Sequence, residues 1–206
     1  MTILIGLTGS IGMGKSTTAR LFNEEGCPVW DADAAVHRLY APGGAAVAPM
    51  AATFPEAIED GAISRARLKA IMSRDPSALA QIESIVHPLV ARDRADFVHN
   101  HRKNLTDLTD PAPVLVLDIP LLFETGADRG MDYTVVVSAP PEVQRARVLE
   151  RGTMTPEQFE NILEKQIPDA EKRARADYVI ETETLESARQ QVQSILRDIR
   201  QRADHA

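Results

Sequence analysis

The pattern of hydrophobic positions in this chain predicts buried strands that alternate with helices. Residues 3–8 form a short apolar run, a helical pattern follows from Lys15 to about Glu25, and Gly26 stands where a helix is expected to end. Residues 28–33 then predict a second short strand that carries two aspartates at its carboxyl end. A strand, a loop, a helix and a strand in this order are typical of a βαβ unit.

Three more β-rich segments follow much later in the chain. They begin at Pro113, Tyr133 and Asp177. The first two are continuous apolar runs, which is the pattern of parallel strands that are covered on both faces. The chain therefore offers five candidate strands for one α/β sheet.

A long insertion separates the second and third candidate strands. It holds about eighty residues, whereas a βαβ crossover requires only about a dozen. Its content is predicted to be helical, with helices over 63–72 and 76–103, the second broken by Pro88. Residues 41–49 resemble a turn at the entrance of the insertion, although the alanines there could also continue a helix.

Two further helical segments complete the pattern. Residues 141–166 predict a helical excursion between the fourth and fifth strands. Residues 184–202 are amphipathic, so we expect a C-terminal helix that packs back on the sheet.

Composition narrows the class of protein. A chain of 206 residues, 44% of them hydrophobic, can close one sizeable core. The net charge of −7, from 30 acidic and 23 basic residues, disfavours a nucleic-acid partner or an anionic membrane surface. The single cysteine, Cys27, excludes an intramolecular disulfide and is expected to be a small buried side chain. No basic leader and no apolar run of about 18 residues is present, so we expect a cytoplasmic protein with no membrane partner.

One short motif carries specific chemistry. Gly9, Gly14, Lys15 and Ser16 have the spacing G-x-x-x-x-G-K-[ST], after a predicted strand and at the start of a predicted helix. Glycine permits the backbone angles and the close approach that a phosphate requires, and Gly12 adds further freedom. Backbone N–H groups and the helix N-terminus would then face the phosphates. Lys15 is expected to bridge the β- and γ-phosphates and Ser16 to bind Mg²⁺.

Missing motifs restrict the kind of nucleotide-binding protein. A GTPase should show the patterns N-K-x-D and D-x-x-G, and neither occurs in the sequence. A motor or a repair ATPase is usually larger. The sequence therefore favours a small kinase, which needs an acceptor site, a group that takes the hydroxyl proton, cations over the transferring phosphoryl group and a closing lid.

Three acidic residues are candidates for these roles. Asp33 is the preferred base or anchor of the acceptor hydroxyl, and the alternative is that it caps the helix that starts there. Asp118 ends the third candidate strand, where a carboxylate would hold water on Mg²⁺; alternatively it orients the turn at Pro120. Glu124, in the same loop, is a weaker candidate for the edge of the site.

Several basic residues are candidates for contacts with phosphate. Arg147 and Arg151 are four residues apart and share a helix face, which would point toward the phosphates if the excursion is a lid. A solvated basic helix face is the alternative. Arg145 is offset from Arg147 by about 200° on an ideal helix and is expected to point elsewhere. His87, taken alone, is a structural hydrogen-bonding residue before Pro88 more often than a ligand.

Taken together, these residues resemble the dephospho-coenzyme A kinase family, whose members phosphorylate the ribose 3′-hydroxyl of dephospho-coenzyme A in the last step of coenzyme A synthesis. The resemblance covers nearly the whole chain. It rests on "GLTGSIGMGKST" near the start, "DAD" at 31–33, "IVHPLV" at 85–90, "DIPLLFE" at 118–124, "Q..R...R" at 144–151 and "KQ....EKRARADYVI" at 165–180.

The resemblance implies an α/β chain with a three-layer P-loop kinase fold, a five-stranded parallel sheet, a helical substrate-binding insertion and a helical lid. All of it would form a single kinase domain over 1–206. The implied core covers 1–33, 112–140 and 176–206, the implied coenzyme-binding insertion about 34–111 and the implied lid about 141–167.

The resemblance also implies roles for individual residues, with ATP as phosphoryl donor and Mg²⁺ as metal. The implied catalytic residues are Asp33, Lys15 and Arg147. Ser16 and Asp118 would bind the metal. The residues implied to bind ATP are Gly9, Gly12, Met13, Gly14, Lys15, Ser16, Thr17, Arg147 and Arg151. Those implied to contact dephospho-coenzyme A are Asp33, His87, Pro88, Leu121 and Glu124.

The chain departs from the family pattern at a few positions. Ser10 and Met13 replace residues common in the family, but they stand at positions of the phosphate motif where side chains are free to vary. Ile162 stands where many members carry an arginine, which leaves the number of lid cations open. Residues 181–187, "ETETLES", replace an Asn-Gly type of turn near the adenine, so the adenine contacts stay unassigned.

Two alternatives to the family's reaction stay open at this stage. One is a kinase of another small acceptor, such as a nucleoside monophosphate, and the other is a non-catalytic, nucleotide-dependent binding module. For the oligomeric state, the expectation is a monomer or a weak homo-oligomer.

Overall fold

The computed structural model describes residues 2–104, 113–203 and 205. The described residues form two compact units, one within 1–30 and 105–206 and the other within 31–104. The end of the predicted insertion at 105–111 and the predicted start of a core segment at 112 lie outside the described residues.

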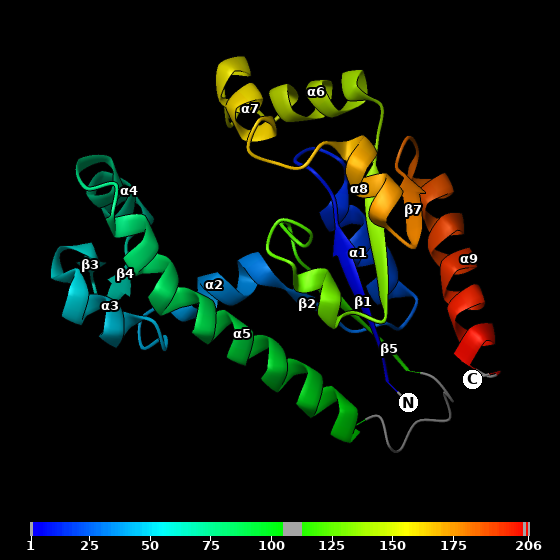
Figure 1. Cartoon of the computed structure of the whole chain (residues 1–206), viewed down its shortest axis with the longest axis horizontal. Helices are drawn as coiled ribbons and strands as arrows, with labels where there is room; N and C mark the ends of the chain where they lie inside the picture. The colour runs from blue at the N-terminus through cyan, green and yellow to red at the C-terminus, as the bar shows by residue number, and fades with distance from the viewer. Residues whose placement is uncertain (1, 105–112, 204, 206) are drawn as a thin grey trace. The chain divides into compact units, whose positions relative to one another are not determined.

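The described helices and strands follow one another along the chain as Figure 1 shows. They are β1 (Ile3–Thr8), α1 (Lys15–Glu24), β2 (Val29–Asp31), α2 (Ala32–Tyr40), α3 (Val47–Thr53), η1 (Pro55–Ala57), β3 (Ile58–Glu59), β4 (Ala62–Ile63), α4 (Arg65–Arg74), α5 (Ala78–Asn104), β5 (Val114–Asp118), η3 (Ala127–Gly130), β6 (Tyr133–Ser138), α6 (Pro141–Glu150), α7 (Pro156–Leu163), α8 (Asp169–Arg175), β7 (Tyr178–Glu181) and α9 (Leu185–Ala203). Among these helices, none has the length and apolarity to cross a membrane.

The first unit is built on a five-stranded sheet with the order β2-β5-β1-β6-β7. β1 lies in the centre and pairs in parallel with β5 and β6, and β6 pairs in parallel with β7. Every residue of β5 is buried, which explains why this strand reads as a continuous apolar run rather than an alternating one. The prediction of a parallel five-stranded α/β sheet is confirmed.

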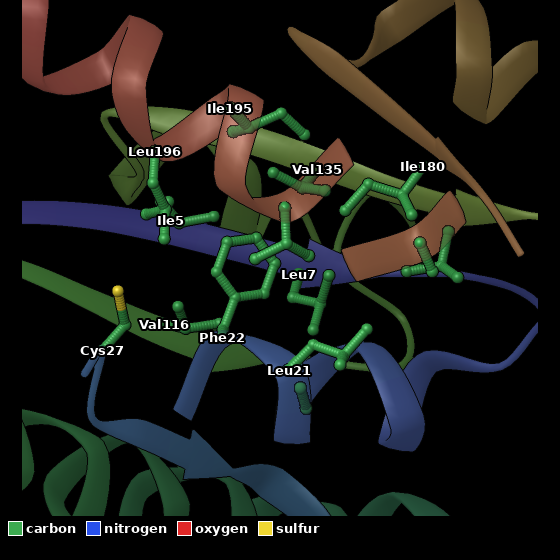
Figure 2. Close-up of a cluster of buried hydrophobic side chains, with 14 of the residues drawn as sticks. Ile5, Leu7, Leu21, Phe22, Cys27, Val116, Val135, Ile180, Ile195 and Leu196 are labelled. Carbon is green, nitrogen blue, oxygen red and sulfur yellow. The ribbon is translucent and has the colours of Figure 1, made fainter. Parts of the chain in front are cut away.

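One face of the sheet packs against α1 and α9. Side chains from β1, β5, β6 and β7 meet those of the two helices in a single cluster, drawn in Figure 2. Phe22 of α1 and Ile199 of α9 are fully buried there, and Cys27 is buried as predicted. The amphipathic C-terminal helix therefore does pack back on the sheet, as its hydrophobic spacing indicated.

The other face is covered by the segment 119–131 and by α8. A Cβ added at Gly6 of β1 would lie 2.9 Å from Leu122 and 2.8 Å from Met131, so the segment lies directly on the strand. The hydroxyl of Ser138, at the end of β6, donates to the carboxylate of Asp169 in α8 at 2.7 Å. Helices and loops thus cover both faces and give the three layers.

The second unit contains α2, α3, α4 and α5 around its own apolar cluster, in which Ala46, Met50 and Ala57 are fully buried. It is not wholly helical, contrary to the prediction, because β3 and β4 form a short antiparallel hairpin. The hairpin turns at Asp60 and Gly61, which both have positive φ, of 50° and 77°. Asp-Gly is a characteristic turn pair for such a hairpin, so this element did have a sequence signal.

The long helix of the insertion is continuous, so the predicted break at Pro88 is wrong. α5 runs from Ala78 to Asn104 with Pro88 inside it. A proline removes one backbone donor and crowds the preceding turn, which costs about 3 kcal/mol in a helix interior. Packing offsets this cost, because Ile82 and Val86 are buried in the cluster and Arg38 of α2 pairs with Asp93 at 2.7 Å.

The predicted strand over 28–33 is shorter than expected. β2 ends at Asp31, whose carboxylate caps α2 by accepting from the N–H of Ala34 at 2.8 Å. Asp33 lies in the first turn of α2, so the alternative that Asp33 caps this helix is wrong. Residues 41–49 were expected to form either a turn or part of a helix. Both occur, because a turn precedes α3, which begins at Val47.

The core cluster of the first unit generates a stability prediction. Phe22→Ala should lower the free energy of unfolding by about 3–5 kcal/mol, because a fully buried aromatic ring is removed. Urea unfolding followed by circular dichroism measures the change. Asn23→Ala, at the exposed neighbouring position of the same helix, should stay within about 0.5 kcal/mol of the parent protein. Equal effects of the two substitutions would contradict the packing described.

Candidate active site

The loop between β1 and α1 has a shape that requires its glycines. Gly14 precedes α1 with φ 91°, and Gly12 has φ 80°. A Cβ at Gly12 would lie 2.5 Å from a methyl group of Val148, and a Cβ at Gly9 would lie 2.7 Å from the carbonyl oxygen of Val137. The loop is therefore a closely packed turn whose backbone conformation and surroundings exclude larger residues.

The loop's lysine is paired with the candidate metal carboxylate. Lys15 begins α1, Asp118 ends β5, and their side chains form an ion pair. Leu7 of β1 is in register with Asp118, so the two parallel strands bring both groups to the carboxyl edge of the sheet. Asp118 is only 1% exposed, and a carboxylate that is this buried requires a cation.

The turn that follows Asp118 is held by another residue. Thr8, at the end of β1, donates its hydroxyl to the carbonyl of Pro120 at 3.1 Å. Asp118 itself pairs with the lysine of the phosphate loop, which is an arrangement expected of a carboxylate at a phosphate site.

Oxygen donors that suit Mg²⁺ are present at this edge. The hydroxyl of Ser16 is exposed at the N-terminus of α1, one residue after Lys15, whose partner is the carboxylate of Asp118. Mg²⁺ prefers oxygen ligands and takes one or two protein groups together with water and phosphate oxygens. No group of three or more histidine, cysteine or acidic side chains with metal-site geometry occurs among the described residues. Ser16 and Asp118 are thus oxygen donors of the kind that Mg²⁺ takes.

Ser10 and Met13, which stand at variable positions of the phosphate motif, both have buried side chains. Their exposed fractions are only 4% and 2%. The sulfur of Met13 lies in the core cluster and accepts from the N–H of Ala139 at 3.1 Å. The side chain of Met13 therefore joins the loop to the core of the first unit.

The helix α6 packs directly on the phosphate loop. Gln144, only 5% exposed, donates its side-chain amide to the carbonyl of Ile11 at 2.7 Å. On the other side of the same residue, the N–H of Ile11 donates to the side chain of Gln166 at 3.4 Å. Sequence reasoning missed both glutamines as site residues, although each belongs to a motif that carried the family resemblance.

Arg147 and Arg151 reach the same pocket as the loop. The pocket has a volume of about 440 Å³ and is lined by Gly14, Thr17, Thr18, Arg147, Glu150, Arg151, Thr182, Glu183, Thr184, Leu185 and Ala188. Arg147 is partly buried and donates to the hydroxyl of Thr182 at 3.0 Å and to its carbonyl oxygen. Arg151 is exposed at the pocket's edge, and Arg145 pairs with Glu160 of α7, away from the loop as predicted.

Two of the positions at which the sequence departs from the family pattern, residues 181–187 and Ile162, lie in different parts of the structure. Thr182 to Leu185, which follow β7, line the pocket just described. Ile162 lies in α7 and is partly buried. Sequence reasoning left the adenine contacts unassigned, and the structure places this turn next to Gly14.

Glu124 is part of a buried ion pair. One of its carboxylate oxygens lies 2.8 Å from Nζ of Lys172, a side chain of α8 with no exposed surface, and also accepts from the N–H of Ile167 at 3.1 Å. Burial alone would raise the pKa of Glu124, but the hydrogen bonds from Lys172 and from backbone N–H groups outweigh it and keep this pKa below its usual value. Lys172 was not recognised from the sequence as a residue of this region.

The remaining candidates divide between the two units. Leu121 is 42% exposed in the loop after β5, in the unit that holds the phosphate loop. Asp33 lies in α2, and His87 and Pro88 lie in α5, so all three belong to the second unit, where they are exposed. The structure thus brings together the predicted donor residues within one unit, while the predicted acceptor residues lie mainly in the other.

The Glu124–Lys172 pair generates a prediction about pH. Because the pKa of Glu124 is lower in the folded protein, its stabilising effect is complete above the unfolded value of about 4.3 and is lost as the pH falls through the folded value. Glu124→Gln should therefore flatten the loss of stability below about pH 4.3. At pH 7 it should cost about 3 kcal/mol, because Lys172 is left buried without its counter-charge.

Urea unfolding between pH 3 and pH 7 measures this change. The double variant Glu124→Gln/Lys172→Met serves as the control and should regain most of the loss at pH 7, because it buries no unpaired charge. Identical pH profiles for the parent protein and Glu124→Gln would rule out a stabilising role for this carboxylate.

Comparison with known proteins identifies the family of this chain. The family model CoaE, described as dephospho-CoA kinase, matches residues 3–187. A dephospho-CoA kinase from Ruegeria pomeroyi is 61% identical over 206 residues, which is the full length of both chains. The crystal structure of TT1252 from Thermus thermophilus is similar with a TM-score of 0.77 at 34% identity, covering 96% of this chain and 97% of that one.

A more distant solved structure has the same fold. It is the dephospho-CoA kinase from Campylobacter jejuni, which superposes with a TM-score of 0.71 at 23% identity and covers 98% of each chain. With the phosphate loop, the sheet order and a family match over most of the sequence in place, the chain belongs to the dephospho-CoA kinase family.

Proposed function

We propose that this chain transfers the γ-phosphoryl group of ATP to the ribose 3′-hydroxyl of dephospho-coenzyme A, the reaction for which its family is named. The observation that carries the proposal is the phosphate loop, in which Lys15 is paired with the buried Asp118 at the carboxyl edge of a parallel sheet. This edge is where open α/β sheets bind their ligands. The named relatives supply the identity of the acceptor.

The donor side of the reaction is assigned to the first unit. The backbone of residues 9–16 would hold the ATP phosphates, and Lys15 would move from Asp118 to the β- and γ-phosphate oxygens. The pocket beside Gly14 and Thr17, which Arg147 also lines, would hold the nucleotide, and the turn after Thr182 would lie next to the adenine base. Ser16 and Asp118 would hold Mg²⁺, which neutralises phosphate charge when it is bound.

The acceptor side is assigned to Asp33 and the second unit. Asp33 is an exposed carboxylate in the first turn of α2, two residues after the end of β2. A carboxylate of this kind can accept the proton of the attacking hydroxyl or orient it. His87, Pro88, Leu121 and Glu124 are proposed to contact dephospho-coenzyme A.

Two larger segments complete the proposal. Residues 34–111 would form the coenzyme-binding insertion. Residues 141–167, which include α6 and α7, would form a lid that excludes water and so suppresses ATP hydrolysis. We also propose that the protein acts in the cytoplasm as a monomer or weak homo-oligomer without a nucleic-acid partner, in keeping with its net charge of −7.

A substrate panel tests the function. The purified protein is incubated with ATP and Mg²⁺ and with dephospho-coenzyme A, AMP, CMP or shikimate, while ADP release and product mass are measured. Turnover of dephospho-coenzyme A alone is the expected result. Turnover of a nucleotide but not of dephospho-coenzyme A would show a different acceptor, and ATP binding without any turnover would favour a binding module.

The role of Asp33 gives a sharper prediction. Asp33→Asn should lower kcat by about a hundredfold or more while leaving the affinity for ATP nearly intact, because the amide cannot accept the proton. Steady-state kinetics and calorimetric titration with ATP measure the two quantities.

Asp60→Asn is the matched control. It makes the same chemical change in the second unit, at a hairpin turn where asparagine tolerates the positive φ of 50°. This control should keep the parent kcat. Parent-level turnover in Asp33→Asn would remove Asp33 from the mechanism.

A further inference from the structure

Thr182, the residue after β7, contacts two parts of the candidate site that are distant in the sequence. Its side chain is buried, with 7% of the residue exposed. The hydroxyl donates to the carbonyl oxygen of Met13 in the phosphate loop at 2.7 Å. Nη1 of Arg147 donates to the same hydroxyl oxygen at 3.0 Å, and Nη2 donates to the carbonyl of Thr182.

The hydrogen-bonding capacity of the hydroxyl fits this arrangement. A threonine hydroxyl has one proton to donate and two lone pairs that can accept. The carbonyl of Ser138 is a more distant acceptor at 3.3 Å, so the proton is directed to Met13. The lone pairs are then free for Arg147, and the carbonyl of Thr182 gives the guanidinium a second acceptor. Two-point contact fixes both the position and the orientation of the planar group.

The phosphate loop also packs against Thr182. A Cβ added at Gly14 would lie 3.1 Å from the hydroxyl oxygen of Thr182. Gly14, Arg147 and Thr182 all line the pocket assigned to the nucleotide. The cation is thus held beside the loop by the protein itself, and a cation that is already oriented needs no reorganisation when negative charge develops during phosphoryl transfer.

We propose that Thr182 is a positioning residue of the kinase reaction. Its hydroxyl joins the loop backbone to Arg147 and so orients the guanidinium for the transferring phosphoryl group. The inference rests on the proposed function, since it requires Arg147 to act on the phosphates. It gives a task to a residue of the "ETETLES" segment, where this chain departs from the family pattern.

Valine and serine substitutions test the hydroxyl directly. Thr182→Val keeps the shape of the side chain but removes the hydroxyl, whereas Thr182→Ser keeps it. For Thr182→Val we expect kcat to fall about tenfold or more, with KM for ATP changed less than about threefold. Thr182→Ser should stay within about threefold of the parent in both constants.

Thr134→Val is the matched control for a merely structural effect. Thr134 is a buried threonine of β6, 6% exposed, whose hydroxyl donates to Asp177 at 2.7 Å. Its loss should lower the thermal stability about as much as Thr182→Val does but leave kcat unchanged. A second comparison uses Arg147→Met, in which Thr182→Val should cause no further loss of kcat, because the two residues act as a unit.

A readout without turnover separates this inference from the proposed function. In NMR spectra of the nucleotide-free protein, the side-chain N–H signals of Arg147 should shift and broaden in Thr182→Val, but not in Thr182→Ser or Thr134→Val. Unchanged Arg147 signals, an unchanged kcat, or equal losses of kcat with and without Arg147 would each overturn the positioning role. If the parent protein phosphorylates no acceptor, the proposed function fails, while the NMR comparison still decides whether Thr182 holds Arg147.

Discussion

The ion pair between Lys15 and Asp118 is the interaction on which the site depends. A carboxylate that is 1% exposed can be tolerated at the end of a buried strand only with a cation beside it, and the phosphate loop supplies that cation. The pairing requires β1 and β5 to be neighbours in register, which in turn requires the apolar runs that let both strands be covered on two faces. The order of the strands, the conformation of the phosphate loop and the pairing of Lys15 with Asp118 therefore depend on one another.

Much of this arrangement could be predicted from the sequence because it depends on local patterns. Continuous apolar runs gave the strands, and the glycine and lysine spacing gave the loop, since both are fixed by neighbouring residues. The errors occurred where one residue serves two elements or where tertiary packing overrides a local rule. Asp31 both ends β2 and caps α2, so no linker marks the boundary between these elements. Pro88 lies inside a continuous α5 because buried side chains on that helix pack in the core of the second unit.

The groups that hold the loop in place could not be predicted in this way. Gln144 and Thr182 bond to loop carbonyls that are 133 and 169 positions away in the chain, and Lys172 pairs with Glu124 before β6. Nothing in their immediate sequence shows that these three side chains are buried. A buried polar side chain is identified by the acceptor or the charge that it meets, and that partner is known only once the fold is known. Sequence motifs thus located the loop, whereas the structure was needed to find its supports.

Met13 gives the loop a property that differs from that of an ordinary surface turn. Its side chain belongs to the same cluster as residues of β1, α1 and α9, and its sulfur accepts a hydrogen bond from the N–H of Ala139, the residue after β6. Local opening of the loop would pull the Met13 side chain out of this cluster, so it requires the surrounding core to open as well. Backbone amides on either side of Met13 should consequently exchange their hydrogens with solvent on the slow timescale of the core, even before any nucleotide binds.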